Sequence, residues 1–186
     1  VLKRCRAARH AVAFDTEESK AIFNKAGRIE RIVPVRRNRA HMIIEECMLL
    51  ANETAARFLS KHACPTLYRV HEAPDPSKVA QLEGLLRIFP LNVRIDKQLK
   101  AETINQIVSA CSGKDYAKIV QIAVLRSMQQ AVYQPDNVGH YGLAYTHYLH
   151  FTSPIRRYPD LIVHRCITHI LQHNTCKKPL YTPQDL

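Results

Sequence analysis

The sequence predicts an α+β fold in which helices dominate, and three observations support this prediction. Apolar residues recur at helical spacing over a long segment, from about 39 to 61. Asp75 followed by Pro76 is a cap residue with proline at the first helical position, which indicates the start of another helix. Strand-like stretches are confined to two regions of the chain, near 13–35 and 141–151.

The first 35 residues are predicted to form a basic helix followed by short strands. The helix covers residues 1–12, and its cationic side chains are Lys3, Arg4, Arg6 and Arg9. Strands are expected at 13–15, 21–23 and 28–35, with a hairpin turn at 25–27 between the last two.

The rest of the chain is predicted to be mainly helical. Helices are expected, in chain order, over about 39–61, from Pro76 to Pro90, over 101–112, over 115–133, and after the 141–151 strand up to about 172. The apolar pattern of the first of these is interrupted by Glu45, Glu46, Asn52 and Glu53. Pro159 leaves two possibilities for the last helix, because an internal proline removes a backbone hydrogen bond. Either a capped turn at 153–158 precedes a regular helix, or one kinked helix is continuous.

Composition and charge favour a basic globular protein with an anionic partner. Hydrophobic residues make up 46% of the 186-residue chain, which is enough for a sizeable core and excludes a disordered tail. The formal charge is +11, and such a charge favours polyanions through counterion release. Nucleic acid is the natural partner, and a merely basic surface is the alternative. No apolar run reaches the ~18 residues that a membrane-spanning helix needs.

The six cysteines and ten histidines do not form a recognisable metal or redox motif. No CxxC pair occurs, and the histidine spacing matches no zinc constellation. Reduced thiols in a cytosolic protein are the simplest interpretation. No metal is therefore expected within this chain.

The segment NVGHYGLAYTHYLHFTSPIRRYPDLIVHR, from Asn137 to Arg165, combines aromatic, hydroxyl and basic side chains. Aromatic faces stack on unpaired bases, and arginine and hydroxyl groups hold phosphates. Ser153 followed by Pro154 is typical of a capped helix entrance, where backbone N–H groups favour an anion. The segment therefore predicts a site for single-stranded nucleic acid.

The same segment closely resembles a signature of the ribonuclease II/ribonuclease R (RNB) family. His140 to Ala144 and His150 to Arg165 match its H-F-G-L-A and H-F-T-S-P-I-R-R-Y-x-D-L-x-x-H-R patterns, with Tyr141 in place of the commoner phenylalanine. The resemblance extends to three more segments, NRAHMIIEECMLLANE, LYRVHEAPDP and LRSMQQAVY, and the last of these is closer to the ribonuclease R branch. It also implies a short strand near 66–71.

This resemblance implies part of a processive 3′→5′ exoribonuclease that hydrolyses single-stranded RNA to nucleoside 5′-monophosphates in the cytoplasm. Residues 1–175 would be the C-terminal part of the catalytic RNB domain, and 176–186 a tail leading to a further module. The family's aspartate cluster, which holds Mg²⁺, would lie upstream, so the chain alone is expected to be inactive. No membrane or DNA partner is expected, whereas exposed core faces predict self-association. The alternative is a non-catalytic RNA-binding module of the same fold.

Arg156 is the predicted catalytic residue, because the family carries a functional arginine at this position. Its planar guanidinium would stabilise charge on the phosphate undergoing cleavage. The competing interpretation is an ion pair with Asp160, one helical turn further on. Arg157 is predicted either to contact phosphate or to form a structural ion pair, and Thr152 and Ser153 either to touch phosphate or to cap the helix.

The remaining candidates for RNA contact lie further apart in the sequence. Either Glu45 or Glu46 could accept a hydrogen bond from a ribose 2′-OH, as the family implies, or pair with Arg39 or Arg57. The basic cluster at 36–39 could be a phosphate track or a solvated loop. Alternation along the 141–151 strand would place Tyr141, Tyr145 and Phe151 on one face and Tyr148 on the other. The full set of candidates is Arg156, Arg157, Thr152, Ser153, Tyr141, His150, Glu45, Glu46, Arg37 and Arg39.

Overall fold

The computed structural model describes residues 1–13, 18–35, 38–95 and 98–186, and confirms the helix-rich α+β architecture. The helices are α1 (Leu2–Ala8), α2 (Arg39–Lys61), α3 (Pro76–Leu86), α4 (Ala101–Cys111), α5 (Ala117–Ser127) and α6 (Tyr158–His173), with short 3₁₀ helices η1 (Tyr141–Leu143) and η2 (Pro183–Asp185). The strands are β1 (Glu18–Phe23), β2 (Ile29–Val35), β3 (Tyr68–Val70) and β4 (Val132–Gln134). No described helix is long and apolar enough to cross a membrane.

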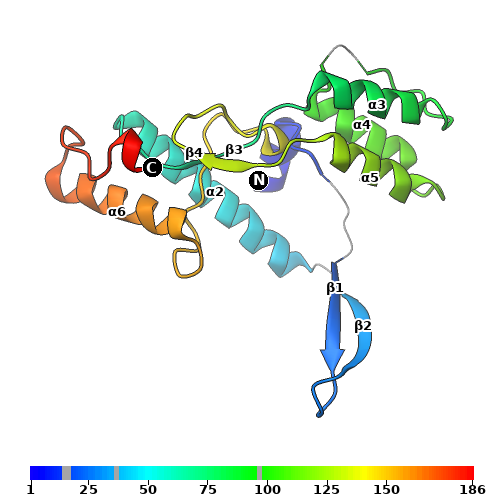
Figure 1. Cartoon of the computed structure of the whole chain (residues 1–186), viewed down its shortest axis with the longest axis horizontal. Coiled ribbons are helices and arrows are strands. Elements are labelled where there is room, and N and C mark those ends of the chain that lie inside the picture. The colour runs from blue at the N-terminus through cyan, green and yellow to red at the C-terminus, as the bar shows by residue number, and fades with distance from the viewer. Residues whose placement is uncertain (14–17, 36–37, 96–97) are drawn as a thin grey trace.

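Helix α2 runs through the middle of the molecule and helps to form the first of two hydrophobic cores (Figure 1). It begins at a capping box, in which the Asn38 side chain accepts from the His41 backbone N–H at 2.9 Å. This first core joins residues from the second half of α2 with β3 and α6: Ala55, Ala56, Leu59, Cys64, Tyr68, Val70, Leu149, Ile162, Val163, Cys166 and Ile170.

The second core lies within the group of helices α3, α4 and α5 at one end of the molecule (Figure 1). Asp75 caps α3 as expected, because its side chain accepts from the Ser77 backbone N–H at 2.7 Å. The fully buried residues here include Ile104, Ile107, Val120 and Val124. Helix α5 ends at Ser127, earlier than the predicted 133, and the Ser127 hydroxyl donates to the Val124 carbonyl at 2.7 Å.

Strands β1 and β2 form an antiparallel hairpin that extends away from the helices (Figure 1). Gly27 has a φ of 73° in the predicted turn, a conformation that glycine adopts without steric cost. The hairpin leaves Phe23, Ile29 and Ile32 at least 60% exposed, so its apolar side chains contribute little to either core.

The expected strand at 141–151 is wrong, and the strand that pairs with β3 is β4 instead. In 137–151, side chains satisfy backbone groups that a strand would use for its ladder. The Asn137 side chain donates to the Thr146 carbonyl and accepts from the Gly139 N–H. The segment therefore forms a 3₁₀ turn and an irregular loop.

Helix α6 begins at Tyr158, with Pro159 in its first turn, where no intrahelical N–H is needed. A turn at 153–157 precedes it, so the continuous kinked helix does not occur. After α6, the end of the chain folds back, and Tyr181 and Leu186 pack against the first core.

Candidate nucleic-acid interface

A buried carboxylate organises the turn before α6. Asp160 is fully buried, and its Oδ2 accepts hydrogen bonds from the Ser153 backbone N–H at 2.7 Å and from the Arg157 guanidinium at 2.8 Å. The Ser153 carbonyl accepts in turn from the backbone N–H groups of Arg156 and Arg157. Asp160 thus fixes both ends of the 153–157 turn and satisfies donors that burial would otherwise leave unpaired.

The two adjacent arginines of this turn have different surroundings, and the alternative in which Arg156 pairs with Asp160 is wrong. Arg157 is the partner of Asp160, at 2.8 Å, with its side chain 20% exposed. Because the helix begins only at Tyr158, Arg156 does not lie one helical turn before Asp160. Arg156 is exposed and forms no ion pair among the residues that the structure describes. Its guanidinium is available to an anion.

The expected side-chain cap at the entrance of α6 is also wrong. The N-cap residue is Arg157, and no side-chain cap hydrogen bond is present. Thr152 Oγ1 is buried without a hydrogen-bond partner in the described part of the chain, and Ser153 is held through its backbone. The partial positive charge of the helix N-terminus adjoins Arg156, so this end of α6 suits an anion electrostatically.

Two stacked tyrosines and one asparagine connect this turn to α2. The rings of Tyr145 and Tyr148 are nearly parallel, with centroids 5.7 Å apart, and both are buried. The predicted alternation would have placed them on opposite faces, but it required a strand that does not form. Buried Asn52 donates to the Tyr148 hydroxyl at 3.0 Å and accepts from the Phe151 N–H at 2.9 Å. Helix α2 thereby positions the segment that leads to Arg156.

His150 lies where these aromatic residues meet the arginines. The Tyr133 hydroxyl is 2.6 Å from His150 Nδ1, and the Arg69 guanidinium lies 4.6 Å above the Tyr133 ring. Burial, followed by the charge of Arg157, lowers the pKa of His150 to about 4, and Arg69 and Arg156 act in the same direction. The imidazole is therefore neutral at pH 7, with three arginines and the opposing carboxylate of Asp160 around it.

Two half-buried histidines of this loop predict a specific acid sensitivity. Burial lowers the pKa of both His140 and His150 from 6.5 to about 4. Between these pKa values the unfolded chain binds more protons than the folded chain. The contribution of the two neutral histidines to the free energy of unfolding is therefore full above pH ~6.5 and is lost as the pH falls towards ~4. His150→Gln is expected to weaken this pH dependence, measured by urea unfolding from pH 7 to 4. His173→Gln, an exposed change on α6, serves as control, and identical wild-type and His150→Gln profiles would contradict the assignment.

Glu45 and Glu46 share a cation that the sequence did not suggest. Arg6 Nη1 lies 3.0 Å from Oε1 of each glutamate. Arg57 pairs with Glu53 instead, at 2.7 Å, so the expected pairing of Glu45 or Glu46 with Arg57 is wrong. The side chain of Glu46 is 15% exposed and that of Glu45 is 34% exposed. Helix α1 therefore balances much of the negative charge on this face of α2.

Arg39 is the arginine of the basic cluster at 36–39 that the structure describes. Arg39 is the first residue of α2, is exposed, and forms an ion pair with neither glutamate among the described residues. Arg37 lies outside the described residues. Arg9, by contrast, places its guanidinium 4.1 Å above the Tyr145 ring. Arg6 of α1 thus meets the glutamates, and Arg9, directly after α1, meets the stacked tyrosines.

Tyr141 is fixed against the second core. Its hydroxyl donates to the Leu99 carbonyl, and its backbone N–H donates to the His71 carbonyl. The His71 ring accepts from the Gly142 N–H at 3.0 Å through Nδ1 and lies 2.9 Å from the Gln129 carbonyl through Nε2. His71 thus joins β3, η1 and the end of α5.

A methyl group at Gly142 would disturb this junction. Its Cβ would lie 2.9 Å from His71 Nδ1, which is too close for a non-bonded carbon. Gly142→Ala is expected to destabilise the fold by about 1–3 kcal/mol, as overpacking does. Gly84→Ala is the matched control on α3, where nothing lies within 4 Å, and should stabilise by about 0.5–1 kcal/mol. Urea unfolding measures both, and equal effects would contradict the assigned role of His71.

Several residues of this interface were not predicted from the sequence. They are Arg6, Arg9, Asn52, Arg69, His71, Tyr133 and His140. For Asn52 a signal was present, because an asparagine that interrupts an apolar helical pattern needs a buried partner. For the others, only the three-dimensional arrangement brings residues so distant in sequence together.

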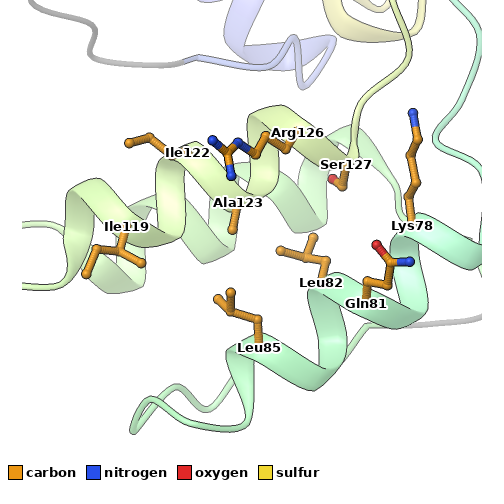
Figure 2. Close-up of a pocket in the computed structure, with 9 residues that line it drawn as sticks. All are labelled: Lys78, Gln81, Leu82, Leu85, Ile119, Ile122, Ala123, Arg126 and Ser127. Atoms are coloured by element: carbon orange, nitrogen blue, oxygen red, sulfur yellow. The ribbon is translucent and has the colours of Figure 1, made fainter.

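A separate apolar groove lies between α3 and α5, away from this interface (Figure 2). Its volume is about 320 Å³, and Leu82, Leu85 and Ala123 point towards one another across it. Lys78 and Arg126 lie at its rim. The groove contains no carboxylate and no histidine among its lining residues, so it offers no chemistry of its own.

The described residues do not fit a metal centre. No group of three or more histidine, cysteine, aspartate or glutamate side chains in 1–13, 18–35, 38–95 and 98–186 could hold a metal ion.

The fold and the basic, aromatic site are those of an RNB domain. The family model described as "RNB domain" matches residues 1–173, so the chain belongs to this family. Among curated proteins, it is similar to ribonuclease R of Escherichia coli, with 43% identity over 171 residues. The match covers 92% of this chain and 21% of that relative, so the chain spans about a fifth of the relative's length. The resemblance inferred from the sequence is thus confirmed.

Solved structures show the same architecture. Ribonuclease R of Mycoplasma genitalium, in complex with ribose-methylated single-stranded RNA, matches with a TM-score of 0.84 and 26% identity. That match covers 100% of this chain and 28% of that protein. Yeast Ssd1, described as a pseudonuclease, matches with a TM-score of 0.66 and 26% identity, covering 80% of this chain and 18% of that protein.

Proposed function

We propose that this chain is the RNA-contacting part of a processive 3′→5′ exoribonuclease that hydrolyses single-stranded RNA to nucleoside 5′-monophosphates. One observation supports this most directly. Arg157 is bound to the buried carboxylate of Asp160, while Arg156 is exposed at the entrance of α6. A fixed turn that presents one unpaired guanidinium beside a helix N-terminus is suited to a phosphate.

The groups around this turn also favour RNA. Arg69, Arg156 and Arg157 all act electrostatically on His150, so positive charge converges there. The M. genitalium ribonuclease R structures contain single-stranded and double-stranded RNA, which supports RNA as the ligand of this fold. An exposed arginine near a phosphodiester would stabilise the charge that builds up during hydrolysis.

The proposal assigns the metal chemistry to residues outside this chain. The described residues contain no metal-ligand cluster, so Mg²⁺ would be held by aspartates elsewhere in the longer protein, where it would supply an activated water. In this scheme residues 1–175 are the C-terminal part of the catalytic domain, and residues 176–186 lead to a further module. The isolated chain would then not hydrolyse RNA. The protein would act in the cytoplasm.

Exposed apolar faces indicate how the isolated chain would behave. Ile43 and Ile44 on α2 and Ile119 and Leu125 on α5 are each more than half exposed. Large unpartnered apolar surface favours association, so the isolated chain is proposed to self-associate.

A non-catalytic RNA-binding module is the second candidate, and one observation favours it. The pseudonuclease Ssd1 has the same fold over 80% of this chain, so the architecture does not require catalysis. The full-length protein distinguishes the two candidates: release of nucleoside 5′-monophosphates supports the enzyme, whereas RNA binding without cleavage supports the module.

RNA binding by the chain itself is expected to fall steeply with salt, because its basic groups would displace counterions from phosphates. For single strands each phosphate contact contributes about 0.7 to the slope of log affinity against log salt. The double variant Arg39→Gln, Arg156→Gln should therefore lower the slope by about 1.4 if each arginine contacts one phosphate. Fluorescence titration with a labelled oligonucleotide measures this.

The matched control for this titration is Arg87→Gln, an exposed arginine of α3 that pairs with Glu83. It removes one positive charge, against two in the double variant, from another part of the molecule. An unchanged slope in the double variant, or an equal change in Arg87→Gln, would show that binding does not use the proposed interface.

A further inference from the structure

Three cysteines from distant parts of the sequence meet at one end of the first hydrophobic core. Cys64 follows the end of α2, Cys166 lies within α6, and Cys176 follows the end of α6. All three are reduced, and all belong to or pack against the same core. None takes part in the proposed RNA interface.

The sulfur atoms of Cys64 and Cys166 are directed at one point. Their thiols donate to the same acceptor, the Pro65 carbonyl oxygen, at 3.6 and 3.8 Å. Two sulfurs within reach of one oxygen atom are neighbours, although 101 residues separate Cys166 from Pro65 in the sequence. The shared acceptor brings the two thiols to the same place in the first core, which is the starting condition for a disulfide.

We propose that Cys64 and Cys166 form a reversible oxidation site, at which hydrogen peroxide converts the two thiols into a disulfide between the end of α2 and the middle of α6. Cytosolic disulfides are usually transient and redox-responsive, which fits two reduced thiols in contact. The inference is independent of RNA binding and catalysis.

The contact between the two thiols makes one of them the better nucleophile. Interaction with Cys64 lowers the pKa of the Cys166 thiol, and the same interaction, followed by burial, raises the pKa of Cys64. Since the thiolate is the reactive form, Cys166 is the better nucleophile of the two. Both sulfur atoms are buried, so a peroxide reaches them when this end of the core opens locally. Burial raises the pKa of Cys176 to about 11, so this third thiol remains protonated.

The chemistry balances in two steps. In the first, the Cys166 thiolate attacks one peroxide oxygen: an S–O bond forms, the O–O bond breaks, and the leaving hydroxide takes up a proton. In the second, the Cys64 sulfur attacks the Cys166 sulfur: the S–S bond forms, the S–O bond breaks, and water leaves with the proton of Cys64. Overall, the two thiols lose two electrons and two protons, and the peroxide becomes two molecules of water.

The test treats the folded chain with hydrogen peroxide, alkylates the remaining thiols under denaturing conditions, and maps the peptides by mass spectrometry. The expected result is a linked Cys64–Cys166 peptide that disappears fully on treatment with dithiothreitol. The oxidised chain should also unfold at higher urea concentration than the reduced chain, because the bridge closes a long loop.

Cys166→Ala and Cys64→Ala should each abolish the linked peptide and the shift in urea midpoint. Cys111→Ala is the matched control, because Cys111 is fully buried in the second core. A bridge from Cys64 to Cys176, or oxidation of Cys166 without a bridge, would overturn the assignment. Because the peptide map uses the wild-type chain, the proposal can be tested even if a variant fails to fold.

Discussion

Replacing Arg156 by lysine in the full-length protein is expected to lower the single-turnover rate of RNA cleavage by about 10²–10³-fold, as loss of one preorganised charge-stabilising donor does. Lysine keeps the charge but loses the planar fork that binds two phosphate oxygens. RNA affinity should change little if the interaction strengthens mainly in the transition state. Stability should also be preserved, because the Arg156 side chain is exposed and forms no ion pair among the described residues.

Rapid-quench cleavage, equilibrium RNA binding and urea unfolding measure these three quantities separately. Arg87→Lys is the matched control, an exposed arginine on α3 whose partner is Glu83. A stable Arg156→Lys enzyme with near-normal cleavage would remove Arg156 from the mechanism. If affinity and rate fell together with an unchanged fold, Arg156 would be a general phosphate contact.

Asp160→Ala is expected to destabilise the isolated chain by about 3–5 kcal/mol, because it leaves a partly buried guanidinium without its counter-charge. Asp160 is fully buried, and its Oδ2 accepts from both Arg157 and the Ser153 backbone. The loss therefore includes one ion pair and one backbone hydrogen bond. Asp160→Asn keeps an acceptor for Ser153 and should cost less.

The surface pair Arg87–Glu83 provides a close comparison for this buried pair. In both pairs the nitrogen and oxygen atoms are 2.8 Å apart, and the two residues are close in sequence. The side chains of Arg87 and Glu83, however, are 76% and 44% exposed. Glu83→Ala should therefore cost no more than about 1 kcal/mol. Urea unfolding compares the variants, and a similarly small loss for Asp160→Ala would show that the turn is held by other contacts.

The helices were predictable from sequence because their signals are local. The pattern over 39–61 and the Asp75-Pro76 cap depend on neighbours within two turns of helix, and the structure reproduces both. The 141–151 segment was not predictable in this way. Its hydrophobic alternation is typical of a strand, but Asn52 from α2 takes up the Phe151 N–H that a strand partner would have used.

The candidate site was predictable as a region, whereas the roles of its individual residues were not. The motif identifies the turn at 153–157, but two adjacent arginines look equivalent in a sequence. Only the start of α6 at Tyr158 decides which of them reaches Asp160. The partner of Glu45 and Glu46 was missed for a related reason, because Arg6 lies 39 and 40 residues away in the chain.

The separation of the two hydrophobic cores has a consequence for how the chain opens. Residues of α3, α4 and α5 are buried against one another, whereas α2, β3 and α6 share a different set of buried side chains. Contiguous units of this kind can unfold sub-globally, each with its own free energy. Amide exchange would then report two protection levels, and a ligand held by Arg156 would slow exchange in α6 while leaving that of α4 unchanged.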